Sequence, residues 1–249
     1  MSEWIPYESS DDPSLEVSID VDFDGDDEFK KSHPFLIKMR ITGFVTDEGG
    51  QPTESAAEEL FELEQRLEGA CEQNDAESVC TVSGSGKYEI YIYAAGAEAA
   101  VALKEDAGGA SLSLDVTAER DDQWKAYERY ILRGNELEDA RDSDQIAQMD
   151  EAGEDLTQEY DVTFDCAVPD KSVKAALHAL NEAGFDTPSD VYDDVIPATR
   201  SMLLTVQNLK TARTQIERAI APFSGTYEGW GIDPDGVDEL DDDENDEEE

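Results

Sequence analysis

The acidic run DVDFDG at residues 20–25 has the residue types that open an EF-hand calcium loop, in which oxygens at alternate positions bind Ca²⁺. A complete loop also needs a bidentate glutamate at its twelfth position, and counting from Asp20 that position is Lys31. The flanking residues alternate between apolar and acidic, which is typical of a strand and not of paired helices. We therefore interpret the run as the solvated face of a strand and predict no metal site.

The segment SGSGK at residues 83–87 contains glycines followed by a lysine, a combination in which backbone amides and an ammonium group can bind phosphate. The spacing of a phosphate loop would put glycine where Thr81 stands and Ser or Thr where Tyr88 stands. Glycine also permits the positive φ that hairpin turns require. The segment is therefore predicted to be a hairpin turn.

The histidines, carboxylates and cysteines of this sequence form no recognisable catalytic motif. The two histidines, His33 and His178, stand in no recognisable triad motif, and each is interpreted as a surface or packing residue. Carboxylates are so numerous that the closeness of any two nominates no general acid and base. The odd number of cysteines and the lack of a CxxC pair indicate buried, reduced thiols. We predict no cofactor; the cysteines are Cys71, Cys80 and Cys166.

The composition restricts the class of partner. The 249 residues include 63 acidic and 18 basic side chains, which gives a net charge of −45. Nucleic-acid affinity comes largely from Lys and Arg that displace counterions, so we expect no direct binding of RNA or DNA. The charge also disfavours anionic membranes, and no apolar run approaches the roughly 20 residues that span a bilayer. The start, MSEWIPYESSDD, lacks the features of a secretory signal, so we expect a cytoplasmic protein.

The acidic residues are not confined to the C-terminal segment, although residues 233–249 hold 12 of them and no base. Self-repulsion of this size opposes compaction unless salt screens it, and at molar salt the Debye length is about 3 Å. Together with only 9 lysines, this favours a salt-adapted host. A disordered chain is the alternative, but 39% hydrophobic residues in periodic blocks are enough for packed cores.

Hydrophobic periodicity predicts the elements of the first half. In chain order they are strands at 15–23 and 35–41, a helix around 56–67, a hairpin with arms at 79–82 and 88–93, a helix at 97–106 and a strand at 112–116. Trp124, Tyr127 and Tyr130 then recur at three-residue spacing, as on one face of a helical segment. For each of the three tryptophans the sequence leaves two roles open, a core residue or a binding anchor.

Residues 134–159 carry 10 acids and the single base Arg141, a charge run that indicates a domain boundary with a short helix before Gly153. The elements predicted after it are a strand at 160–164, a helix at 173–180 ending before Gly184, strands at 185–192 and 202–208, a helix at 212–220 and a strand at 226–232. Their order is β-α-β-β-α-β.

The first half shows the same order with an added leading strand. The predicted fold class is therefore α+β, with two ferredoxin-like (split βαβ) domains, antiparallel sheets with helices on one face, and a disordered acidic C-terminal tail. The predicted bounds are a first domain at 1–135, an acidic linker with a short helix at 136–158, a second domain at 159–232 and the tail at 233–249.

Two family resemblances rest on short motifs. AGEDL at 152–156 and YEGWG at 227–231, in the predicted β-α-β-β-α-β order, resemble the regulator of ribonuclease E activity B family. The first half is similar to the uncharacterised family called domain of unknown function 695, which is commonly fused to that regulator. The residues that carry this second similarity are Trp4, Tyr7, Gly50-Gln51-Pro52, Leu60, Leu63, Glu64, Leu67, Asp122, Trp124 and Tyr127.

The regulator resemblance implies a non-catalytic protein that binds an RNA-degrading endoribonuclease or its scaffold and lowers its activity. A strongly acidic protein suits this role, because it is attracted to basic RNA-contacting surfaces and cannot bind RNA itself. The expected partner-binding residues are Tyr227, Gly229, Trp230 and Gly231 on the last predicted strand. Two alternatives remain open: an enzyme that uses clustered carboxylates with or without a divalent metal, and an acidic nucleic-acid mimic that binds basic proteins.

Overall fold

The computed structural model describes residues 2–107, 112–189 and 195–232, and the chain divides between Asp144 and Gln145 into two compact units. Both units are mixed α+β structures with antiparallel sheets, as predicted. The predicted acidic tail and part of the predicted strand at 185–192 lie outside the described residues. Among the helices that are described, none is long and apolar enough to cross a membrane.

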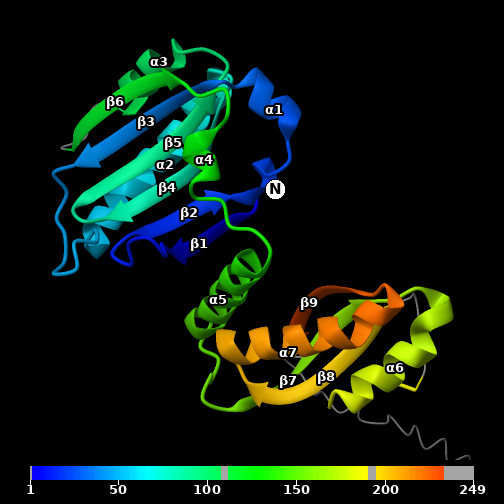
Figure 1. The fold of residues 1–249 in the computed structure, drawn as a ribbon. Coiled ribbons are helices and arrows are strands. Elements are labelled where there is room, and N and C mark those ends of the chain that lie inside the picture. Colours follow the sequence, from blue (N-terminus) through cyan, green and yellow to red (C-terminus); the bar gives the residue numbers. More distant parts are fainter. Residues whose placement is uncertain (1, 108–111, 190–194, 233–249) are drawn as a thin grey trace, which may run out of the picture. The chain divides into compact units, whose positions relative to one another are not determined.

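The first unit is built on a six-stranded antiparallel sheet with the order β1-β2-β4-β5-β3-β6 (Figure 1). Its last four strands follow the predicted order, β3-α2-β4-β5-α3-β6. Two strands precede them where one was expected, because the short segment WIPYE pairs with the predicted leading strand. The strands are β1 Trp4–Glu8, β2 Glu16–Asp20, β3 Phe35–Thr42, β4 Ala76–Gly84, β5 Lys87–Ala94 and β6 Ser113–Arg120.

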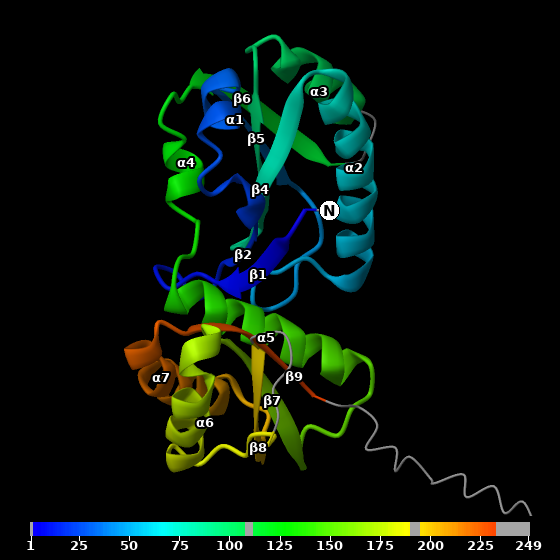
Figure 2. The same cartoon turned by 90° about the vertical axis from the view of Figure 1, so that its right-hand side faces the viewer.

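Helices lie on both faces of this sheet, which differs from the predicted single helical face (Figure 2). On one face Leu60, Leu63 and Leu103 of α2 and α3 form a core with the inward side chains of β3 and β5. On the other face the predicted aromatic repeat supplies a second core, because Trp124 and Tyr127 are fully buried. The helical elements are the 3₁₀ turn Val21–Phe23, α1 Asp27–Ser32, α2 Glu54–Gln73, α3 Ala99–Ala107 and α4 Lys125–Glu128.

Helix α5, Asn135–Glu151, spans the point where the two units divide and is longer than the predicted short helix. In the first unit its Arg141 forms an ion pair with Glu3 at 2.7 Å. Farther along, Ile146 and Met149 pack against the core of the second unit. Most of the charge run thus lies on a helix, in which Asp142 is buried at 2% exposure and Glu136, Asp150 and Glu151 are exposed.

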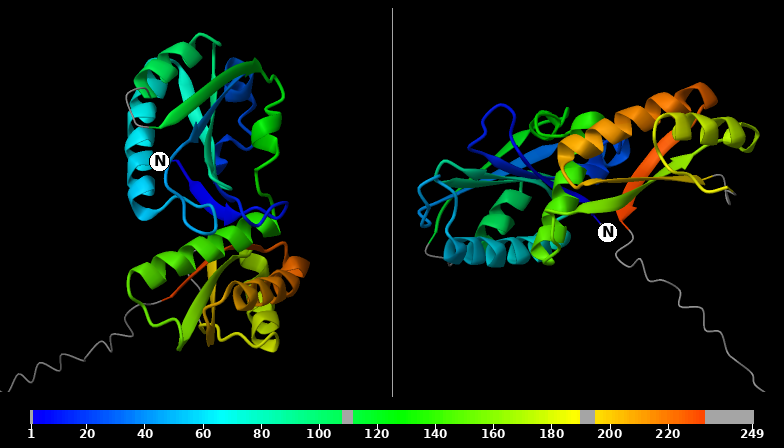
Figure 3. Two further views of the ribbon diagram at one scale, coloured as in Figure 1. Left: turned by 90° about the vertical axis from the view of Figure 1, so that its left-hand side faces the viewer. Right: turned by 90° about the horizontal axis from the view of Figure 1, so that it is seen from below.

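The second unit is a two-layer structure with the strand order β8-β7-β9 and two helices on one face of the sheet (Figure 3). The helix-facing residues Val162, Phe164 and Cys166 of β7 are fully buried. The elements are β7 Glu159–Ala167, a 3₁₀ turn Asp170–Ser172, α6 Val173–Glu182, β8 Val195–Leu203, α7 Val206–Ile220, a 3₁₀ turn Ala221–Phe223 and β9 Thr226–Ile232.

The strand predicted at 202–208 is wrong, because α7 begins at Val206 and the strand lies earlier, at Val195–Leu203. The side chain of Thr205 accepts a hydrogen bond from the backbone N–H of Asn208 and so caps the helix. Pro197 is tolerated within β8 because this strand lies at an edge of the described sheet, where a missing N–H costs little.

Candidate functional site

The predicted partner-binding residues all lie on β9, which pairs with β7 and forms an edge of the described three-stranded sheet. The pairing contains a β-bulge: Tyr227 lies opposite Cys166 and Gly229 lies opposite Asp165, so Glu228 is the extra residue. Gly229 has a φ of +146°, which only glycine adopts without strain. Downstream of the bulge, Trp230 lies opposite Phe164.

The bulge determines which face of the sheet each of these side chains occupies. Residues three apart on a regular strand point to opposite faces, but the extra residue puts Tyr227 and Trp230 on the same face. This is the helix-facing side, where both side chains are half-buried against the core and the Tyr227 ring lies 6.5 Å from that of Phe164. Gly229 and Gly231 lie on the outer face, opposite Asp165 and Thr163.

The structure therefore separates the four predicted residues into two pairs. Tyr227 and Trp230 support β9 from inside the domain, and Gly229 and Gly231 leave the outer surface of the strand without side chains. A Cβ atom placed on either glycine would meet no heavy atom of the described chain within 4 Å. The outer face of β9 is accordingly open, and a partner's backbone can approach it closely.

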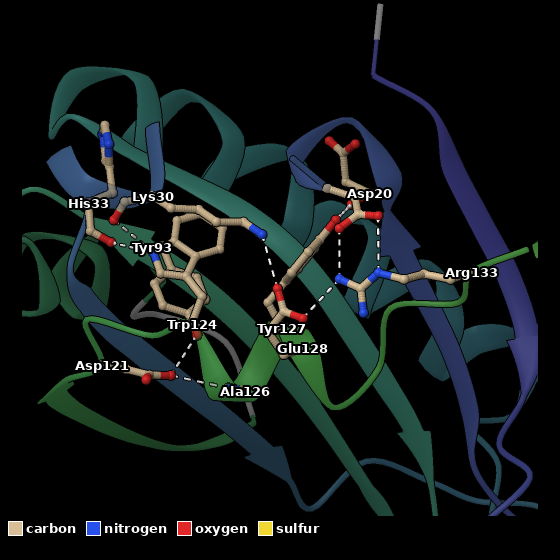
Figure 4. A network of polar contacts seen from close by, with 11 residues as sticks. Asp20, Lys30, His33, Tyr93, Asp121, Trp124, Ala126, Tyr127, Glu128 and Arg133 are labelled. Carbon is tan, nitrogen blue, oxygen red and sulfur yellow. Dashed lines mark hydrogen bonds and ion pairs between the residues drawn. The ribbon is translucent and has the colours of Figure 1, made fainter. Parts of the chain in front are cut away.

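In the first unit, Trp124 and Tyr127, two of the aromatic residues that carried the family resemblance, belong to a buried network with Tyr93 (Figure 4). The indole Nε1–H of Trp124 donates to the backbone carbonyls of Lys30 and His33, at 3.1 and 3.0 Å. Its ring stacks on Tyr93 with a centroid separation of 3.8 Å, and the Tyr93 hydroxyl donates to Asp121 at 2.8 Å. Trp124 is thus a core residue that fastens the α1 and α4 segments to the sheet.

The acidic run at 20–25 was predicted to be a solvated strand face. This is wrong, because β2 is followed by the 3₁₀ turn Val21–Phe23 and ends at the buried Asp20. That residue is only 2% exposed, and its side chain accepts a hydrogen bond from the backbone N–H of Asp22, which caps the 3₁₀ turn after β2. Its backbone carbonyl accepts a hydrogen bond from the Tyr127 hydroxyl at 2.8 Å (Figure 4). Burial raises the pKa of the Asp20 carboxyl. Asp24 pairs with Arg133 at 2.7 Å.

A cavity of about 550 Å³ lies beside Asp20 in the first unit, and sequence reasoning did not identify it. No lysine, arginine or histidine occurs among the described lining residues, so the cavity disfavours phosphate. Burial raises the pKa of Glu64, although this carboxylate also accepts a hydrogen bond from the Tyr88 hydroxyl at 2.6 Å. Its acidic lining residues come from β2 and from the consecutive elements α2 and β4; they are Asp20, Glu64, Glu68, Glu72 and Glu77.

The other residues that the sequence analysis considered for chemistry lie in a turn, in the core or on the surface. SGSGK forms the predicted hairpin turn between β4 and β5, with positive φ at Gly84 and Gly86. His33 is a packing residue, stacked on Phe29, and His178 is a surface residue beside Glu182. The three cysteines are buried free thiols, as predicted. In the described part of the chain, no group of three or more His, Cys, Asp or Glu side chains is placed to hold a metal ion.

Comparison with known families gives two matches that divide the chain as its units do. Residues 4–132 match the family of unknown function DUF695, and residues 139–232 match the regulator of ribonuclease activity B. Comparison with curated proteins gives no match. A solved structure described as an unknown protein from Galdieria sulphuraria is 9% identical over 81% of this chain and 98% of that one; its TM-score of 0.23 is too low to bear on the fold.

Proposed function

Because this chain belongs to the family of unknown function DUF695 and continues into a region that matches the regulator of ribonuclease activity B, we propose that it is a non-catalytic regulator. It binds an RNA-degrading endoribonuclease or its scaffold in the cytoplasm and lowers the cleavage activity. The single observation that carries this proposal is the regulator match, which includes strands β7, β8 and β9 and helices α6 and α7 of the second unit. The proposed domain bounds are 1–135 and 159–232, each with a ferredoxin-like plan.

The charge of the chain supports a mechanism based on protein contact. A net charge of −45 disfavours contact with RNA, so the regulator reduces cleavage by binding the enzyme and not by covering the substrate. Basic RNA-binding surfaces of a ribonuclease attract such a protein at low ionic strength. At molar salt this long-range attraction is screened, and specificity then depends on close contacts.

We place these close contacts on β9. Gly229 and Gly231 expose the strand, while Tyr227 and Trp230 hold it against the helix-covered core. An interface needs such a rigid centre, because ordering a mobile strand on binding would cost free energy. Substitution of Trp230 therefore weakens partner binding by loosening β9, and the effect on binding exceeds that of removing residues 233–249.

A pull-down from lysate of the source organism, at its own ionic strength, tests this proposal. The bait is the full chain, compared with Trp230→Ala and with a chain that lacks residues 233–249. We expect the full chain to retain an endoribonuclease, with loss of that enzyme for Trp230→Ala and retention for the shortened chain. Failure of the full chain to retain or inhibit any endoribonuclease overturns the proposal. If removal of the tail alone abolishes binding, the chain is an acidic mimic that acts by charge.

A further inference from the structure

The second unit has two surfaces of different composition, the helical layer and the outer face of the β8-β7-β9 sheet. Paired residues on neighbouring strands share a face, so the partners of the outward residues of β7 are also outward. The hydroxyls of Thr163 and Thr199 lie 3.1 Å apart across β7 and β8, which is consistent with that register. The outward positions are Glu159, Asp161, Thr163, Asp165 and Ala167 on β7, Val195, Pro197, Thr199, Ser201 and Leu203 on β8, and Thr226, Gly229 and Gly231 on β9.

The cations of the second unit belong to the helical layer. Lys171 lies in the turn before α6 and Lys174 lies on α6. Lys210 and Arg218 lie on α7. The two remaining arginines are turned inward from α7 and β8. Arg213 is only 2% exposed; Arg200 stacks 3.7 Å from the ring centroid of Phe185 and donates to the carbonyls of Gly184 and Ala183.

None of the outward positions of the described strands carries a basic side chain, whereas three carry carboxylates. Asp161 and Asp165 are exposed and lie four residues apart on the central strand, about 13 Å along it at the usual rise. The carboxylate of Glu228, at the bulge, is exposed beside them. All charged side chains on the outward positions of the described strands are therefore negative, whereas the helical layer carries both signs.

The outer face is also arranged in rows that follow the strands. Edge strand β8 presents apolar side chains towards its two ends, Val195 and Pro197 at one and Leu203 at the other, with Thr199 and Ser201 between them. Leu203 is 41% exposed. Central strand β7 presents the acidic row, and β9 presents the two glycines without side chains. A surface of this form accommodates a chain segment that lies flat, with apolar side chains over β8 and basic side chains over β7.

We infer that the outer face of the β8-β7-β9 sheet is the docking surface for a basic, amphipathic segment of the protein partner. This inference rests on the proposed function and specifies the surface used and the chemistry of the partner segment. Charge complementarity selects a cationic occupant, and the apolar side chains towards the two ends of β8 select a protein segment over a simple polycation. Arginine side chains suit the central row best, since a guanidinium pairs with a carboxylate through two parallel hydrogen bonds.

Matched charge reversals on the two surfaces of the unit test this inference. The sheet-face variant is Asp161→Lys with Asp165→Lys, and the control is Glu182→Lys with Glu217→Lys on exposed positions of α6 and α7. Both variants change the net charge equally. The probe is the purified endoribonuclease recovered in the pull-down, titrated with full-length chain in high salt. We expect at least a tenfold weaker Kd for the sheet-face variant and less than a twofold change for the control.

Substitution of Gly231 gives a second arm that does not depend on charge. Gly231 is not in the left-handed region and its outer side is open, so Gly231→Leu adds bulk without backbone strain and is expected to weaken binding about tenfold. Unfolding midpoints confirm that each variant is folded. Equal weakening by both charge reversals, or full binding by the sheet-face and Gly231 variants, overturns the inference and leaves the proposed function intact. Absence of binding by the unaltered chain overturns both.

Discussion

Glu89 provides a quantitative test of the structure of the first unit. Its side chain is 4% exposed on β5 and forms ion pairs with Lys38 at 2.8 Å and Arg40 at 2.6 Å from the neighbouring strand β3. The Tyr91 hydroxyl donates a third hydrogen bond, at 3.0 Å. Burial alone would raise the pKa of Glu89, but these three donors lower it from the ordinary value of 4.5 to about 2.

The shift gives the magnitude and the sign of the expected effect. A tenfold change in a proton equilibrium corresponds to about 1.4 kcal/mol, so a pKa lowered to about 2 corresponds to roughly 3 kcal/mol of stabilisation. Because Lys38 and Arg40 are partly exposed, water screens the pairs and we expect about 2 kcal/mol. A lowered pKa stabilises the fold above the ordinary value, and this stabilisation is lost as the pH falls through about 2.

The substitution Glu89→Gln removes the charge and keeps the shape. Urea unfolding at pH 7, followed by circular dichroism, should show a free energy of unfolding about 2 kcal/mol below that of the unaltered chain. The difference should shrink as the pH falls from 4.5 to 2. Glu119→Gln, an exposed carboxylate on β6, is the control, with an expected change under about 0.5 kcal/mol. A change that small for Glu89→Gln at pH 7, or a difference that is the same at pH 2, would refute the assignment.

Three further predictions concern the same unit and the whole chain. Trp124→Phe leaves two buried carbonyls without their indole donor and should lower the free energy of unfolding by about 2–4 kcal/mol in urea titrations; a loss below about 1 kcal/mol would contradict the buried network. Gly84→Ala should cost more than Gly86→Ala in the same assay, because a Cβ at Gly84 would lie 2.2 Å from a backbone oxygen and one at Gly86 meets nothing within 4 Å; equal losses would contradict this geometry. Raising KCl from 0.1 to 2 M should raise the thermal midpoint, since salt screens the net charge of −45, and a lower midpoint would count against salt adaptation.

Helices and strands that bury a single face could be predicted from the sequence, because their apolar residues recur at a regular spacing. Helix α6 and strand β7 each show one apolar stripe and were predicted close to their observed places. For α7 the stripe predicted residues 212–220 but not the first turns, which begin at Val206. Strand β8 was missed because Pro197 interrupts its pattern, and the consequence of Pro197 depends on whether the strand lies at an edge. That position is a property of the sheet order, which the segment itself does not encode.

Features formed by several segments were also beyond the sequence. The acidic cavity combines side chains from β2, α2 and β4, and each of these looks like an ordinary solvated carboxylate in its own segment. The candidate site shows the same limit: the sequence YEGWG marked the correct strand, but the faces of Tyr227 and Trp230 depend on one bulge in the pairing with β7. A shift of one residue in register moves a side chain to the other face.

The rate of RNA cleavage by the purified endoribonuclease, measured against increasing concentrations of the full-length chain at the ionic strength of the source organism, tests the central claim most directly. The account predicts a saturable fall in the rate at a fixed RNA concentration. A rate that stays constant up to concentrations well above that of the enzyme would contradict the account.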